Sequence, residues 1–557
     1  MGGKMKKTII GLLAMAAVVP AAAVPPPILG QASWPIEASR LSDTVKVIAS
    51  DYFEGRAPGS QGEKKTVAWL IKQYQSLGLE PAGDKGGWTQ AVPLVHTRLG
   101  KADRLEITTQ QGKRPLQSDK DIYLASLRPV NRIALNKVPL VFVGYGVSAP
   151  ERGWDDFKGV DLKGKIAVFL INDPDFSAVS GDDAFEKFGG RSMTYYGRWT
   201  YKFEEAARRG AVGALIIHDS QGAGYGWDTV IAPAGEGYDI IRGDKDKPVA
   251  LQGWLSQAAA QDIFAKSGFD LDSLKKQARQ KSFQPVSLKG SVFSASLPVS
   301  YQNITSYNVL GQIKGAKRPD ETIMFGAHWD AYGIGAPDSQ GRTIRSGAID
   351  DGVGVAAVLE LARVFKAEHQ PDRTLVFASW TAEERGILGS SYYAEHPLFP
   401  LDKTVANFTV DVLQTAGRSK DVLLIGAGQN SLENDLAAAA KEENRVVKAE
   451  LLPERGLFFR ADHLPFARKG VPVLLMMGMA GAYDLREGGM AAGEKWLSGY
   501  MKCYHQTCDR WTENDDFEGA AEDVKLIYLM GHHLAFSDQK PEWLPNSEFK
   551  TKTVTKE

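Results

Sequence analysis

This sequence lacks an excess of charge of either sign, and it has only two cysteines. Its 66 basic and 67 acidic residues give a formal net charge of −1, so nothing electrostatic favours nucleic acid or an anionic membrane as a partner. The aromatic residues are not interleaved with a basic run either. A hydrophobic content of 43% and a charged content of 24% are typical of a soluble globular protein, and 557 residues predict two or three domains.

Long apolar runs are also scarce, and the clearest one is at the N-terminus. Three lysines within the first seven residues precede an apolar run over 9–19, and residues 21–23 are all alanine. This run is too short for a comfortable membrane span, and no cysteine follows to carry a lipid. We expect a signal peptide over 1–23, cleaved after Ala23, and a secreted or periplasmic chain without a membrane segment. An uncleaved anchor is the alternative.

The two cysteines, Cys503 and Cys508, lie in one short segment with four residues between them. An oxidising compartment would let them pair. Two unpaired thiols are the alternative, because the sequence does not fix the distance between their Cα atoms.

The N-terminal part reads as helix, loop, helix, loop. Apolar residues at helical spacing predict a helix over 66–77, which Gly78 would end. The polar segment over 51–61 has the Gly and Pro residues of a loop, which we interpret as a connector.

Two further sections alternate strands with helices, which favours α/β architecture. In the section that begins near residue 135, strands are predicted over 138–143, 165–171 and 211–218, and a helix over 203–209. In the section 299–536, strands are predicted over 322–327, 374–380, 405–410, 422–425 and 471–477, and helices over 353–366, 432–443 and 522–532. The last section predicts a doubly wound sheet with helices on both faces.

Five potential metal ligands stand at or near the ends of predicted elements in this last section. Open α/β sheets place their functional sites at the carboxyl ends of strands. A set of two imidazoles and three carboxylates is suited to bind divalent cations such as Zn²⁺. The five are His328, Asp350, Glu384, Asp411 and His505, and three further carboxylates lie beside them, Asp330, Asp351 and Glu383.

His328 follows the strand TIMFGA, and Asp330 two residues later could bond the outer imidazole nitrogen and fix its tautomer. A structural histidine is the alternative. Asp350 lies in GAIDDGVG, which opens a helix, and its two oxygens could bridge two cations. An ordinary helix cap would explain one Asp, but not the pair with three glycines.

The adjacent Glu383 and Glu384 follow the strand TLVFASW. Two ionised neighbours repel unless cations neutralise them. We assign Glu384 as a ligand and Glu383 as the general base, and a solvated helix start is the alternative. Asp411, which ends a strand, would be a terminal ligand, and His505 would complete the set.

Taken together, these segments resemble the M28 family of metallopeptidases, the co-catalytic zinc aminopeptidases and their relatives. The resemblance covers roughly 299–536 and is carried by GAHWDA, GAIDDGVG, TAEERGILGS, the strand end at Asp411, and YHQTCD. It implies a mixed, mainly parallel sheet of the zinc-exopeptidase type and two Zn²⁺ per chain. By this resemblance Asp350 bridges the metals, and the Asp350–Asp351 peptide is cis.

The same resemblance implies that His328 and Asp411 hold one zinc and that Glu384 and His505 hold the other. Glu383 would be the catalytic base and proton shuttle. We also assign Asp330 to the catalytic residues, in a supporting role beside His328. Asp462, in the segment RADHLPF, matches a part of relatives often found near the pocket, and a structural loop is the alternative.

The segment 53–83 resembles the usual start of the M28 peptidase domain, so the domain is expected to be discontinuous, over 33–130 and 291–540. The inserted smaller α/β unit, 131–290, resembles a protease-associated domain through 144–174 and 204–219. Such inserts serve substrate access or protein contacts, and a rigid spacer is the alternative. The polar residues 541–557 predict a flexible tail.

The function expected is an exported zinc-dependent exopeptidase that removes N-terminal residues from peptides. A carboxypeptidase or amidase of the same fold is the alternative within the enzymes. A non-catalytic, receptor-like binding protein is a third hypothesis, which predicts lost ligands. All five ligands and Glu383 are present, and this disfavours it. The sequence leaves the oligomeric state open.

Overall fold

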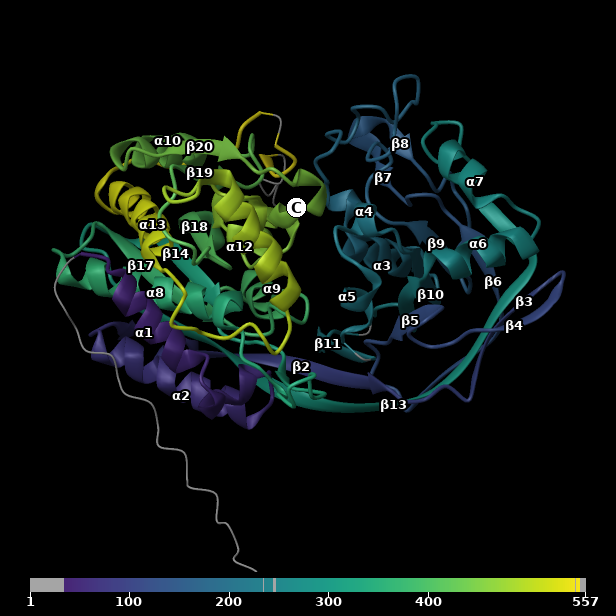
Figure 1. Cartoon of the computed structure of the whole chain (residues 1–557), viewed down its shortest axis with the longest axis horizontal. Helices are drawn as coiled ribbons and strands as arrows, with labels where there is room; N and C mark the ends of the chain where they lie inside the picture. The colour runs from purple at the N-terminus through teal and green to yellow at the C-terminus, as the bar shows by residue number, and fades with distance from the viewer. Residues whose placement is uncertain (1–34, 234, 244–246, 546, 551–557) are drawn as a thin grey trace, which may run out of the picture.

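A single 28-residue strand, β13 (Val286–Ile313), joins two α/β units that lie side by side (Figure 1). The computed structural model describes residues 35–233, 235–243, 247–545 and 547–550. The predicted signal peptide, 1–23, and the last residues of the predicted tail lie outside the described residues. None of the helices in the described part is both long and apolar enough to cross a membrane.

The first unit is built on a mixed sheet in the order β11–β2–β13–β17–β14–β18–β21. Its four strands β17, β14, β18 and β21 are parallel, and the three others are added antiparallel at one side. Besides β13, the strands are β2 (Thr89–Leu99), β11 (Glu236–Ile240), β14 (Arg318–His328), β17 (Arg373–Trp380), β18 (Thr404–Val410) and β21 (Val473–Met476). The predicted mixed α/β sheet is confirmed.

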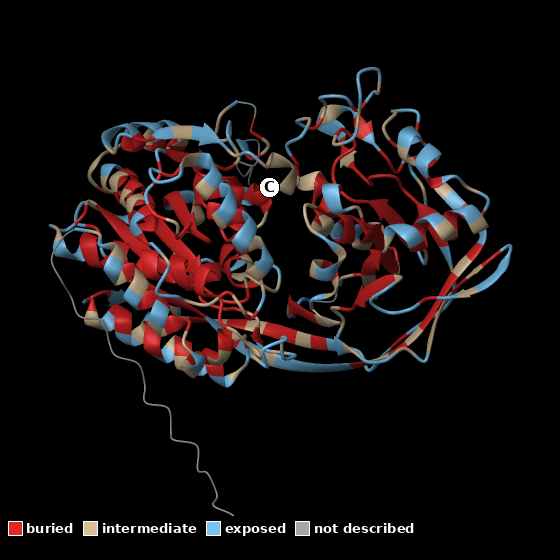
Figure 2. Cartoon of the chain, viewed as in Figure 1, coloured by how far each residue is buried: buried red, intermediate tan, exposed pale blue. Residues whose placement is uncertain are grey.

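Helices cover both faces of this sheet, and its central strands are therefore buried on both sides (Figure 2). Along β14, Ile323 and Phe325 pack into one core layer, whereas Met324 between them packs into the other. This burial explains why the parallel strands are almost continuously hydrophobic. The helices are α1 (Ala38–Ile48), α2 (Gln61–Ser76), α8 (Val353–Ala367), α10 (Leu432–Glu442) and α13 (Glu518–Phe536) on one face, and α9 (Leu388–Glu395) and α11 (Leu464–Arg468) on the other.

The second unit has its own sheet, in which β6, β9, β10 and β12 are parallel. Its strands are β3 (Arg104–Thr109), β4 (Gly112–Pro115), β5 (Ile122–Ala125), β6 (Arg132–Phe142), β9 (Ile166–Leu170), β10 (Gly213–Ile217) and β12 (Leu251–Leu255). One face packs against α6 (Gln257–Lys266) and α7 (Leu271–Gln277), and the other against α3 (Trp199–Arg208), α4 (Ser220–Ala223) and α5 (Trp227–Ile231).

The predicted boundaries at 130/131 and 290/291 stay predictions, but the pairing of strands bears on both. β3, β4 and β5 precede residue 130 and pair within the second sheet. Residues 290 and 291 lie inside β13, so the backbone has no break there. In the opposite direction, β11 lies in the predicted insert and pairs with β2 of the first sheet. The resemblance of the insert to a protease-associated domain also stays a prediction.

Most predicted elements of the first unit are present with ends shifted by a few residues. The predicted helix over 353–366 is α8, and the one over 66–77 is α2, which begins five residues earlier. The predicted strand over 422–425 is β19 (Asp421–Leu424), but it pairs with β20 (Val446–Ala449) in a separate sheet of two strands. Helix α12 (Gly489–Cys503) was not predicted.

Candidate metal centre

All five predicted ligands come together at one edge of the first sheet. His328 ends β14, Asp411 follows β18, and Glu384 lies four residues after β17. Asp350 lies in a distorted turn, η6 (Ala348–Gly352), which leads directly into α8, and His505 follows α12. The carboxyl ends of the parallel strands meet at this edge, which is where open α/β sheets carry their sites.

Asp350 lies between the two histidines. Its Oδ1 is 3.1 Å from Nε2 of His328, and its Oδ2 is 3.3 Å from Nε2 of His505. Each histidine also has a carboxylate of its own. Nε2 of His505 is 3.1 Å from Oε2 of Glu384, and Nε2 of His328 is 3.7 Å from Oδ1 of Asp411. The arrangement therefore forms two adjoining ligand groups that share Asp350.

Asp351 has a different role from its neighbour. Its oxygens accept hydrogen bonds from the backbone amides of His328, Gly354 and Val412, at 3.2, 2.9 and 3.1 Å. An oxygen of Asp351 also lies within 4.8 Å of ligand atoms of His328 and Asp411. Because it already accepts from three backbone amides, Asp351 connects the ends of β14 and β18 to the start of α8. The Asp350–Asp351 peptide is cis, as predicted.

Asp330 and Glu383 lie beside the ligands. The imidazole Nδ1 of His328 is 3.1 Å from the backbone oxygen of Asp330 and 3.6 Å from its Oδ1. The same Oδ1 accepts a hydrogen bond of 3.0 Å from the backbone amide of Glu383. The Glu383 carboxylate lies 3.8 Å from Nε2 of His328. Asp330 thus holds the imidazole with Nε2 towards Asp350, and it also fixes the backbone that presents Glu383.

The centre is a buried concentration of acid groups. Burial raises the pKa of Glu384 to about 7 and holds the pKa of Glu383 well above its ordinary value, and nearby carboxylates add to both shifts. Burial also raises the pKa of Asp350, but the close imidazoles of His328 and His505 outweigh it and lower that pKa. Such a group of carboxylates is stable when positive charge is placed among them.

The donor set fits divalent cations. Two imidazole nitrogens and three carboxylates are the ligand types that Zn²⁺ takes in proteins. Nε2 of His505 is buried and makes no hydrogen bond to any residue that the structure describes, although two carboxylates lie close to it. A buried imidazole nitrogen without a hydrogen bond, directed at carboxylates, is what a metal ligand requires.

Residues 308–526, which span this centre, match the model of Peptidase family M28. Over this stretch the chain is similar to the peptidases of family M28. A stretch of 129 residues is 36% identical to Aminopeptidase NAALADL1 of Mus musculus and covers 22% of this chain and 16% of that protein. A stretch of 244 residues is 30% identical to Leupeptin-inactivating enzyme 1 of Streptomyces exfoliatus and covers 41% of this chain and 50% of that protein. The matches thus span half or less of the length of these curated relatives.

The solved structure of an aminopeptidase from Aneurinibacillus sp. strain AM-1 aligns with 91% of this chain and 95% of that chain, with a TM-score of 0.50 and 19% identity. At this level of identity the likeness shows a shared fold.

Arg56 braces the metal centre from outside the matched residues, and the sequence did not reveal this role. Arg56 lies in the segment interpreted as a connector, which is in fact a short 3-10 turn, η1 (Asp51–Arg56). Its guanidinium is fully buried and donates to the backbone oxygens of Trp329, Ile48, Ser346 and Gly347, at 2.6, 3.0, 2.5 and 2.8 Å. It therefore ties the residue after His328 to the turn that carries Asp350. The one signal for it was an arginine within the matched segment FEGRAPG.

Asp509 is a second residue whose role was missed. Its carboxylate accepts hydrogen bonds from the backbone amides of Ile349 and Asp350, at 2.8 and 3.1 Å. Burial raises its pKa to about 7.

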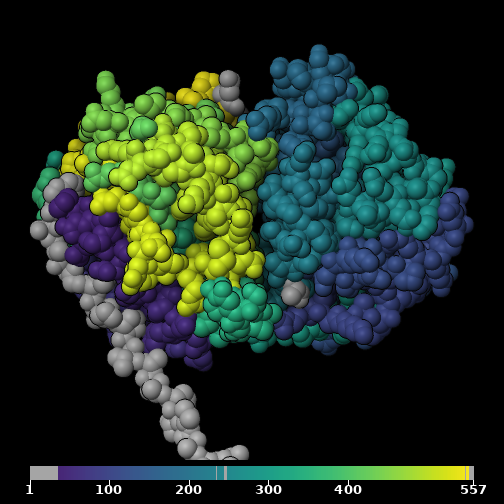
Figure 3. All heavy atoms as spheres, in the orientation of Figure 1, coloured from purple at the N-terminus to yellow at the C-terminus, as the bar shows by residue number. Residues whose placement is uncertain are grey.

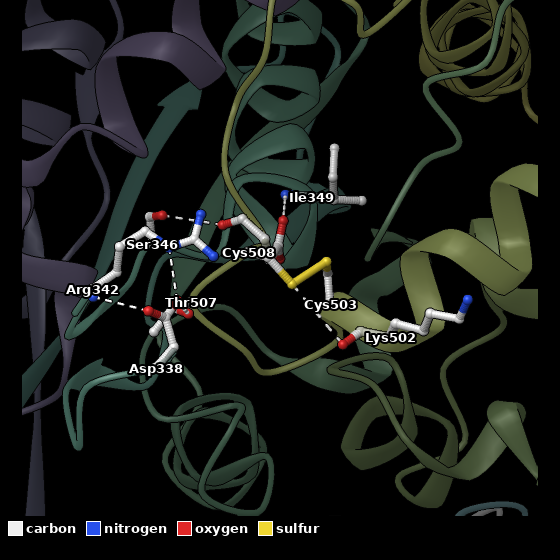
Figure 4. Close-up of a disulfide and its surroundings, with 9 residues drawn as sticks. Asp338, Arg342, Ser346, Ile349, Lys502, Cys503, Thr507 and Cys508 are labelled. Carbon is white, nitrogen blue, oxygen red and sulfur yellow. Dashed lines mark hydrogen bonds and ion pairs between the residues drawn. A yellow bond between two sulfur atoms is a disulfide. The ribbon is translucent and has the colours of Figure 1, made fainter. Parts of the chain in front are cut away.

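Cys503 and Cys508 form a disulfide, as one of the two alternatives predicted (Figure 4). The disulfide closes the loop that carries His505, and Asp509 bonds the end of that loop to the turn that carries Asp350.

Two tyrosines enclose His505. The ring centroids of Tyr332 and Tyr504 are 4.5 and 3.6 Å from that of His505. The Tyr504 hydroxyl accepts a hydrogen bond of 3.2 Å from Arg460. Asp462 is also buried near the centre, where its Oδ1 accepts from Ser390 at 2.5 Å, and burial raises its pKa to about 7.

Proposed function

We propose that this chain is a zinc-dependent exopeptidase that removes N-terminal residues from peptides, with two zinc ions per chain. The observation that carries the proposal is the position of Asp350, whose two oxygens face two different histidines at 3.1 and 3.3 Å. A carboxylate in this position is suited to bridge two cations. The M28 match supports peptide hydrolysis as the reaction, and so do the names of the relatives, two of which are aminopeptidases.

In this proposal His328 and Asp411 would hold one zinc, His505 and Glu384 would hold the other, and Asp350 would contribute to both. When bound, the two ions supply Lewis-acid polarisation of the scissile carbonyl and lower the pKa of the attacking water. Glu383 accepts the proton from that water and returns it to the leaving amine.

Asp330 orients the side chains of Glu383 and His328. Its hydrogen bond to the Glu383 amide fixes the base, and its contacts with Nδ1 of His328 fix the imidazole. Arg56 and Asp509 hold the turn of Asp350 in place through backbone hydrogen bonds. The geometry of the centre is thus set by residues that lie far apart in the sequence.

The test is to assay purified, zinc-loaded protein with peptides that have free or acetylated N-termini. Release of the N-terminal residue from free peptides only is the expected result. Cleavage of only the acetylated peptides would support the carboxypeptidase or amidase alternative and refute the aminopeptidase assignment. A protein that binds peptides but cleaves neither set would support the receptor-like alternative.

We also propose that the chain is exported to a secreted or periplasmic location. The signal-like residues 1–23 motivate this, and a disulfide is typical of oxidising compartments. N-terminal sequencing of protein from the producing cells tests it. A mature N-terminus at Val24 is expected, and a reduced, cytoplasmic protein with Met1 intact would contradict it.

A further inference from the structure

A cavity of about 420 Å³ lies between the two units. The second unit contributes Tyr225 and Asp228 to its wall, and the first unit contributes Arg455, Arg460 and Tyr504. Figure 3 shows the seam where the yellow-green surface of the first unit meets the blue-teal surface of the second. The cavity is therefore a shared feature of both units and exists only because they are packed together.

The cavity adjoins the metal centre. Tyr504 lines it, and the Tyr504 ring lies 3.6 Å from the ring of His505. Arg460 lines it as well and donates to the Tyr504 hydroxyl at 3.2 Å. A peptide whose N-terminal residue reached the centre could extend its remaining part into this cavity.

Arg455 and Arg460 line the cavity, and Arg198 lies near Arg460 without lining it. None of these three arginines has an acidic partner among the described residues. The side chain of Arg198, just before α3, is 6% exposed, and its Nε has no hydrogen bond partner among the described residues. Arg455 makes one weak contact, 3.9 Å to the sulfur of Met501, and Arg460 bonds only Tyr504. Within the described part of the chain, no carboxylate lies within 4.0 Å of these three guanidinium groups.

The three charges also act on one another. Burial lowers the pKa of Arg198 to about 10, and the positive charge of Arg460 adds to this shift. Burial lowers the pKa of Arg455 as well, again with a contribution from Arg460. Lys502 adds a further positive charge to the wall, and Asp228 is the one acidic group among the residues that line the cavity. The site therefore has an excess of positive charge, much of it buried.

Buried charges are normally paired, because an unpaired one loses its solvation by water without compensation. A guanidinium pairs best with a carboxylate, through two parallel hydrogen bonds. We propose that this cavity is a subsite for a carboxylate on the part of the substrate that follows the cleaved bond. The proposal rests on the proposed exopeptidase function and deepens it, since it makes short peptides with a nearby free carboxylate the preferred substrates.

The carboxylate could be the C-terminal α-carboxylate of a tripeptide or an acidic side chain. Three peptides separate these sources: Leu-Ala-Ala, its C-terminal amide, and Leu-Asp-Ala amide. The zinc-loaded enzyme is assayed with each, and KM and kcat are determined separately. A KM about tenfold or more lower for Leu-Ala-Ala than for its amide identifies the α-carboxylate. A similarly low KM for Leu-Asp-Ala amide identifies the side chain.

Two variants assign the effect to the cavity. Arg198→Gln and Arg455→Gln should each reduce the preference for the carboxylate peptide about tenfold. Arg455 is half-buried, so Arg455→Gln still tests the subsite if Arg198→Gln does not fold. The matched control is Arg132→Gln at the exposed start of β6, where Arg132 pairs with Asp103, and it should keep the preference.

Calorimetry measures the Kd of each of these peptides for the zinc-loaded Glu383→Gln variant. These values compare the affinities of the three peptides without turnover. Equal KM and equal Kd for all three peptides would overturn the subsite. Absence of hydrolysis together with tighter binding of the carboxylate peptides would overturn the exopeptidase function and keep the subsite.

Discussion

Replacing Arg56 by methionine is expected to lower the free energy of unfolding of the first unit by about 3–5 kcal/mol. Arg56 donates four hydrogen bonds to backbone oxygens at 2.5–3.0 Å, and each bond from a charged donor contributes roughly 1.5–3 kcal/mol. Methionine leaves those oxygens without a donor. It also removes a buried charge, whose desolvation costs several kcal/mol, and this offsets about half of the loss.

The assay is thermal unfolding of the zinc-loaded protein, followed by near-ultraviolet circular dichroism. For a domain of this size, about 3–5 kcal/mol corresponds to a decrease in Tm of roughly 6–20 °C. The matched control is Arg418→Met in the same unit, where Arg418 pairs with Glu518 and both side chains are about half exposed. Such a pair contributes at most about 1 kcal/mol. If Arg56→Met unfolded within 2 °C of the wild type, the bracing role of Arg56 would be refuted.

Two further substitutions test the turn and a buried acid. Gly347 has φ +53°, and an added Cβ would lie 2.2 Å from the backbone oxygen of Asp350, so Gly347→Ala should lose bound metal. The control is Gly341→Ala, because Gly341 has φ +76° and open space around it. This control should lower the free energy of unfolding by about 1 kcal/mol and keep its bound metal. Full metal content in Gly347→Ala would contradict this. Burial raises the pKa of Glu63 from 4.5 to about 7, so its contribution to stability is present below pH 4.5 and is lost as pH rises to 7. Between pH 5 and 8, the free energy of unfolding of the wild type should therefore fall by up to about 3 kcal/mol relative to that of Glu63→Gln. Denaturant unfolding at several pH values measures both, and parallel curves of unfolding free energy against pH would refute this.

The positions of the candidate ligands were predictable because the sequence marks them. A buried strand that ends in a polar residue is visible as a pattern, as at His328 and Asp411. The glycines around Asp350 mark a turn in the same way. The structure brings these positions together, and the bridging role of Asp350 stays a prediction from the family resemblance.

Other features depend on contacts between distant parts of the chain. Arg56 bonds oxygens 273–291 residues away, and no local pattern records such contacts. Strand β13 mixes polar and apolar residues and contains Pro298, so its sequence reads as a boundary between domains. In the structure the same strand pairs with both sheets. The arginine cluster likewise forms only when Arg198 of the second unit meets Arg460 of the first.

The most direct test of the central claim is metal content and turnover measured together in Glu383→Gln. The account predicts two zinc ions per chain, as in the wild type, because the five ligands are intact. It predicts a loss of about 10²–10⁴-fold in kcat, the usual contribution of a general base. A variant that keeps two zinc ions and the wild-type kcat would contradict the role of Glu383, and a wild-type protein that binds one zinc at full activity would contradict the shared Asp350.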